Sequence, residues 1–70
     1  MTNAERMASW VREHYPAWDI MDQPSLLDAA FAACDEIDPT GENYDGTDCD
    51  DAVGILRTWR ANEHGPEDAE

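Results

Sequence analysis

Four side chains in this sequence are of the types that bind zinc or act as nucleophile and base: Cys34, Cys49, His14 and His64. A zinc site usually takes its ligands in close pairs, such as C-x-x-C or H-x-x-x-H, because one turn of chain then presents two ligands. No such pair occurs here, and both cysteines fall on apolar stripes, where buried thiols are common. We therefore expect core thiols, a packed His14 and no metal or cofactor. A disulfide between Cys34 and Cys49 remains open at this stage.

The sequence also lacks the patterns of an enzyme. Ser9 and Ser25 stand in no nucleophile motif, and no glycine-rich loop for phosphates is present. Carboxylate pairs are abundant, but on so small a domain they would lie on a solvated surface rather than in a pocket. We therefore expect a non-enzymatic protein.

Negative charge is the dominant chemical feature. The chain has 70 residues, a net charge of −13 and no lysine. Nucleic acids and anionic membranes would repel such a chain, whereas a basic protein surface would attract it. The charge is densest between positions 35 and 51, a stretch without Lys or Arg whose acids are Asp35, Glu36, Asp38, Glu42, Asp45, Asp48, Asp50 and Asp51.

A calcium site is the main alternative use of these acids. If Gly46 is set at the glycine of an EF-hand loop, Asn43 and Asp45 fall at two ligand positions, but Gly41 and Ala52 occupy the first and last ones. The run Asn43-Tyr44-Asp45-Gly46-Thr47 resembles the middle of a dockerin calcium loop, without its terminal ligands and without a second copy. Calcium binding is therefore the least favoured of three functional hypotheses.

The elements that must position these residues are three helices. Thr2 and Glu5 form a T-x-x-E capping box, apolar residues follow at helical spacing, and Pro16 ends the pattern, so we predict a helix over 3–15. Residues 17–23 form a connector in which Trp18 and Ile20 are expected to fold over the core; the alternative is an exposed contact patch.

Two further helices are predicted over 24–37 and 48–63. Pro24 suits a first turn, and the buried stripe of this second helix is expected to hold Leu26, Leu27, Ala30, Phe31, Ala33, Cys34 and Ile37. Thr47 or Asp48 is expected to cap the third helix, Gly54 lies in its interior, and Gly65 and Pro66 are expected to end it. The prediction is an all-α three-helix bundle, with one domain over 1–64 and an acidic, disordered tail over 65–70.

The functional hypothesis follows from charge. We expect an acidic face to dock onto a basic, nucleic-acid-binding site of a protein partner, in the manner of a phage-type inhibitor or nucleic-acid mimic. The alternative is an acidic structural or assembly module adapted to a salty solvent, including a homodimer. With no leader-like segment and no apolar span, a cytoplasmic setting is expected. The residues expected to contact the partner are Asp28, Asp35, Glu36, Asp38, Glu42, Tyr44, Asp45, Asp48, Asp50 and Asp51.

Overall fold

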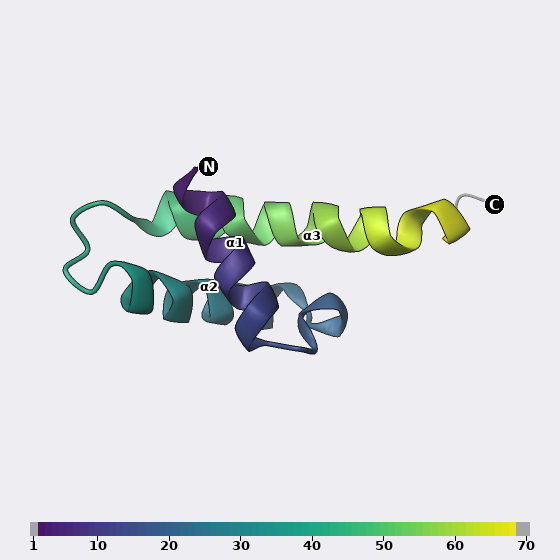
Figure 1. Cartoon of the computed structure of the whole chain (residues 1–70), viewed down its shortest axis with the longest axis horizontal. Helices are drawn as coiled ribbons and strands as arrows, with labels where there is room; N and C mark the ends of the chain where they lie inside the picture. The colour runs from purple at the N-terminus through teal and green to yellow at the C-terminus, as the bar shows by residue number, and fades with distance from the viewer. Residues whose placement is uncertain (1, 69–70) are drawn as a thin grey trace.

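Three α-helices and one short 3-10 helix form the protein, as a computed structural model shows for residues 2–68, with side chains described for residues 2–63. The helices are α1 (Asn3–His14), η1 (Trp18–Ile20), α2 (Gln23–Ile37) and α3 (Gly46–Asp68). In Figure 1, α2 and α3 run side by side from a shared loop, and α1 crosses over them. Residues 2–68 contain no strand. The predicted all-α three-helix bundle is confirmed.

The start and end of α1 follow the local sequence closely. Thr2 Oγ1 accepts the Glu5 N–H at 3.1 Å, and Glu5 Oε1 accepts the Thr2 N–H at 2.8 Å, so the predicted capping box is present. The helix ends at His14, just before the Tyr15-Pro16 pair. His14 is exposed instead of packed in the core, and its ring stacks on Trp10 with 4.1 Å between ring centroids.

The core is made of small and medium-sized side chains from all three helices. In α2 the buried positions include Ala29, Ala30 and Ala33, whose small size lets neighbouring helices approach closely. Phe31 was predicted to be buried, but its side chain is 47% exposed. Phe31 lies two residues from both Ala29 and Ala33, and a helix with 3.6 residues per turn therefore carries it to the far side. The largest fully buried side chains are Met7, Val11, Leu26, Cys49 and Leu56.

The connector before α2 divides its apolar residues between core and solvent. Trp18 is buried as predicted, whereas Ile20 is 81% exposed, so the prediction for Ile20 was wrong. Both belong to the 3-10 helix η1. Because such a helix has three residues per turn, side chains two positions apart point in different directions, and only one of the two can face the core.

A buried carboxylate organises the loop between α2 and α3. Asp38 follows the end of α2 and is only 7% exposed. Its Oδ2 accepts the N–H groups of Asn43 and Tyr44 at 2.8 and 2.9 Å, and its Oδ1 accepts the Thr40 hydroxyl at 3.1 Å. These bonds, first of all the one from the Asn43 amide, lower the pKa of Asp38. The loop is therefore a folded structure held on one side chain.

The third helix differs from its predicted bounds at both ends. The Asp45 N–H donates to Asp48 Oδ2 and the Asp48 N–H donates to Asp45 Oδ1, each at 3.1 Å, so Asp45 caps the helix in place of the predicted Thr47 or Asp48. The helix also continues through Gly65 and Pro66 to Asp68. Glycine and proline disfavour a helix without forbidding it. Residues 69–70 of the predicted tail lie outside the described residues.

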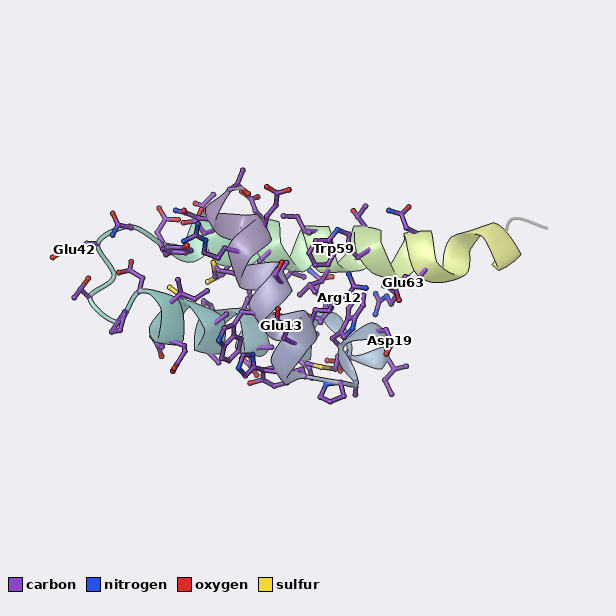
Figure 2. All side chains as sticks on the ribbon, viewed as in Figure 1. Arg12, Glu13, Asp19, Glu42, Trp59 and Glu63 are labelled. Carbon is purple, nitrogen blue, oxygen red and sulfur yellow. The ribbon has the colours of Figure 1, made fainter. Side chains whose placement is uncertain are left out.

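Aromatic and arginine side chains join the C-terminal end of α1 to η1 and α3. The Arg12 guanidinium lies over the rings of Trp18 and Trp59, 5.6 and 5.5 Å from their centroids, and its Nη2 is 3.1 Å from Glu63 Oε2. Figure 2 shows Arg12 near Trp59 and Glu63, far from the loop at the other end. Beyond this contact α3 extends past the bundle (Figure 1). No helix within residues 2–68 is long and apolar enough to cross a membrane.

Replacing Asp38 with asparagine should lower the melting temperature at pH 7, since a neutral amide oxygen accepts hydrogen bonds more weakly than a carboxylate. The pKa of Asp38 is lowered on folding, so its ionised form stabilises the protein above its ordinary pKa of 3.8. That contribution is lost as the pH falls through the lower folded value. The difference in melting temperature between wild type and Asp38→Asn should therefore shrink below pH 3.8.

The matched control is Asp35→Asn, which removes the same charge from an exposed position of α2. Thermal unfolding followed by circular dichroism over a pH series measures both variants. An equal loss of melting temperature in the two variants at pH 7 would contradict the structural role of Asp38.

Candidate protein-interaction surface

Four of the residues predicted to contact a partner are engaged within the fold. Asp38 is buried in the loop, and Asp45 and Asp48 cap α3 through reciprocal bonds. Tyr44 is only 8% exposed and belongs to the core. A side chain this deeply buried offers little surface to a partner, so its position argues against the predicted role of Tyr44 as an anchor.

The other six predicted residues are all exposed, and five of them lie around the loop end of the molecule. Figure 1 shows that the last turn of α2, the loop and the first turns of α3 form this end. We call this group the acidic end. Figure 2 places Glu42 at the tip of the loop. Asp28, the sixth, lies two turns earlier on α2. The members of the acidic end are Asp35, Glu36, Glu42, Asp50 and Asp51.

Three of the four arginines make their contacts within the chain, away from the loop. Besides the contacts of Arg12, Arg60 Nη1 donates to the backbone carbonyls of Asp19 and Met21 at 3.4 and 3.0 Å. Arg57 Nη1 donates to Gln23 Oε1 at 3.3 Å. These three cations therefore serve the packing of α3 on α1, on η1 and on the start of α2, and none of these contacts is with a residue of the acidic end.

A hollow of about 650 Å³ lies between α1 and α3. Its apolar part is formed by Ala4, Ile55 and Trp59, and four carboxylates line it, with no cationic side chain among the described residues that do so. The hydrogen bonds from the Asn3 amide to Asn43 O at 2.7 Å and to Asp48 Oδ2 at 3.4 Å hold the start of α1 against α3 here. The lining carboxylates are Glu5, Asp48, Asp50 and Asp51.

A second hollow of about 360 Å³ lies on the α2 side of α3, where Gln23, Leu27 and Arg57 contribute to its lining. Asp50 and Gly54 line both hollows, so this strip of α3 is the ridge that separates them. A Cβ atom added to Gly54 would meet nothing within 4 Å. Sequence reasoning did not find this site. The one signal for it was a glycine in the interior of a helix.

The two cysteines are free and contribute to the core. Cys49 is buried and Cys34 is half-buried against the same cluster. Burial, together with the neighbouring Cys34 thiol, raises the pKa of the Cys49 thiol to about 11, and burial also raises the pKa of Cys34. Within residues 2–63, no three histidine, cysteine, aspartate or glutamate side chains are grouped so as to hold a metal ion.

The fold and this surface define a class of protein: a small three-helix bundle with an acidic end and a carboxylate-lined hollow beside it. Comparison with known protein families, curated proteins and solved structures found no match to the chain.

Substitution by alanine should change the stability of the protein in opposite directions at two of its glycines. Gly54→Ala should raise the free energy of unfolding by about 1 kcal/mol, because Gly54 lies in a helix with open space around it. Gly41→Ala should lower it by about 1 kcal/mol, because the φ of Gly41 is +71°, where a side chain is strained. Urea unfolding measures both, and changes of the same sign would contradict this assignment.

The native protein should resist thiol reagents at pH 8. The thiolate is the reactive form, and the raised pKa of Cys49 leaves almost none of it. In the Cys34→Ser variant, Ellman's reagent should therefore react with Cys49 only after a denaturant is added. Equally fast reaction with and without denaturant would show that Cys49 is not buried in solution.

Proposed function

We propose that this protein is a small, non-enzymatic binding protein whose negatively charged face docks onto a basic, nucleic-acid-binding site of a protein partner. It would act as an inhibitor of that site, in the manner of the small nucleic-acid mimics that phages encode. The observation that carries the proposal is the acidic end: five exposed carboxylates around one loop, while three of the four arginines make their contacts elsewhere.

The placement of charge supports this proposal better than the net charge alone does. A solvated acidic protein can spread its carboxylates and intersperse cations among them. Here Arg57 and Arg60 contact Gln23 and the backbone carbonyls of Asp19 and Met21, before the acidic stretch, and Arg12 contacts Glu63, after it. The result is a molecule with one strongly negative end, which would steer its approach to a basic surface.

The crowding of the acids suits a site that binds phosphates. Asp35 and Glu36 are adjacent on α2, and Asp50 and Asp51 are adjacent on α3, so each helix presents closely placed negative charges beside the loop, as a nucleic-acid strand does. A basic groove that gains affinity by releasing its counterions to nucleic acid would gain it in the same way from this end. Asp35 and Glu36 on α2 would face such a groove together with Glu42 at the loop tip.

The second candidate, an acidic structural or assembly module, has one observation in its favour. Phe31 and Ile20 are large apolar side chains that remain exposed on the monomer, and a partner subunit could cover them. A module adapted to salt would need molar salt to fold, whereas a binding protein would fold in dilute buffer. The dependence of the melting temperature on salt separates these two candidates.

Glu42→Lys tests the acidic end by a single charge reversal at the loop tip, where the residue takes no part in capping α3. The immobilised full-length protein is used to capture partners from a lysate of its source cell, and DNA or RNA is then added. The captured partner should be displaced by nucleic acid, and Glu42→Lys should slow its association about threefold to tenfold at low ionic strength, with less effect at high salt.

Glu13→Lys is the matched control, since it makes the same charge change on an exposed position of α1 distant from the loop tip (Figure 2). Its association rate should stay close to that of the wild type. Capture that nucleic acid does not displace, or equal effects of the two reversals, would overturn the proposed function.

A further inference from the structure

We propose that the strip of α3 around Gly54, with the hollows on its two sides, is the docking site for a basic amphipathic helix of the partner. This inference rests on the proposed function and deepens it, because it names the surface that orients the partner. That surface is the strip of α3 around Gly54 with its two hollows. The acidic end would then attract the partner, while this face would hold it.

The first observation is the shape of this face. Gly54 forms part of a ridge on α3, with a hollow of about 650 Å³ toward α1 and one of about 360 Å³ toward α2. Two helices pack with the side-chain ridges of one helix in the grooves of the other, and the helix axes approach most closely where the contact residues are small. A helix laid across Gly54 could place side chains in both hollows.

The second observation is the glycine itself. Glycine in a helix interior is unfavourable, and here neither a positive φ nor a neighbouring group of the chain requires it. The position where its Cβ would lie is open, so the absence of a side chain serves no internal packing. The open space leaves room for a close approach by a helix from outside the chain.

The third observation is the charge of the larger hollow, which identifies the occupant; the smaller hollow is lined by Arg57 as well as Asp50 and suits an apolar side chain against Leu27. Ile55 and Trp59 offer half-buried apolar surface in the larger hollow, and Glu5, Asp50 and Asp51 line the same hollow. Lysine or arginine side chains of an amphipathic helix would reach these carboxylates while its apolar face covers Ile55 and Trp59. A second copy of this chain is disfavoured as the occupant, because each copy has a net charge of −13.

The probe is a synthetic peptide of leucine, alanine and lysine that forms an amphipathic helix of about five turns. Titration of the isotope-labelled full-length protein, followed by amide NMR, should shift the signals of Gly54, Ile55 and Glu5. Gly54→Leu should weaken binding about tenfold or more, because a large side chain on the ridge blocks close approach. Gly54→Ala should also weaken it, even though this variant is expected to be more stable than the wild type.

Ala17→Leu is the control for an added side chain, since it adds leucine at an exposed position before η1, outside both hollows. Glu42→Lys is the control for charge outside the hollows. Neither should reduce peptide affinity as much as Gly54→Leu. A peptide with glutamate in place of lysine should not bind.

Several results would overturn this inference. They are no binding of the lysine peptide, equal binding of the glutamate peptide, or loss of binding in Glu42→Lys but not in Gly54→Leu. Sedimentation that shows a dimer, lost in Gly54→Leu, would assign the face to a second copy instead. Failure of the proposed function has a different signature, because it appears when nucleic acid does not displace the captured partner.

Discussion

Hydrogen bonds from backbone amides to carboxylates fix the helix starts and the loop of this acidic chain. At the start of α1, Glu5 accepts a hydrogen bond from the Thr2 amide, and at the start of α2, Asp22 accepts one from the Ser25 amide. At the start of α3, the side chains of Asp45 and Asp48 each accept a hydrogen bond from the other residue's amide. Asp38 accepts two loop amides in the same way. Hydrogen bonds to the ionised form lower the pKa of Glu5, Asp22 and Asp38. At the helix starts the negative charge also meets the positive end of the helix dipole. A chain without lysine thus places part of its negative charge where peptide groups stabilise it.

Some of these carboxylates bond to amides close by at a helix start, whereas Asp38 bonds to amides across a loop. This difference explains which parts of the fold could be predicted from the sequence. The capping box of Thr2 and Glu5 and the stop before Pro16 are local patterns, so α1 could be predicted closely. The burial of Asp38 could not, because it depends on Gly41 turning the loop so that Asn43 and Tyr44 point their amides back. Once that turn forms, Tyr44 is carried into the core, although its acidic neighbours make it look like a surface residue.

The candidate site was harder to predict because residues distant in the sequence build it. Glu5 and Trp59 line one hollow only after α1 has crossed α3, and no pattern along the chain relates the two positions. Gly54 was visible as an unfavourable residue in a predicted helix, but the sequence could not show whether an internal neighbour filled the space. Of the ten residues predicted to contact a partner, the six that neither cap α3, nor accept loop amides, nor pack in the core are all exposed.

Two surfaces with different physical roles can therefore lie next to each other on one small bundle. Exposed charges such as Glu42 act over about 10 Å at moderate salt, and they change the rate at which a partner arrives more than the time it stays. Apolar contact with Ile55 and Trp59 acts only at close range and slows dissociation. Asp50 and Asp51 belong to both surfaces, since they lie in the acidic end and line the larger hollow. A partner drawn to the loop would thus already be beside Gly54, and a small shift along α3 would convert a long-range attraction into an oriented complex.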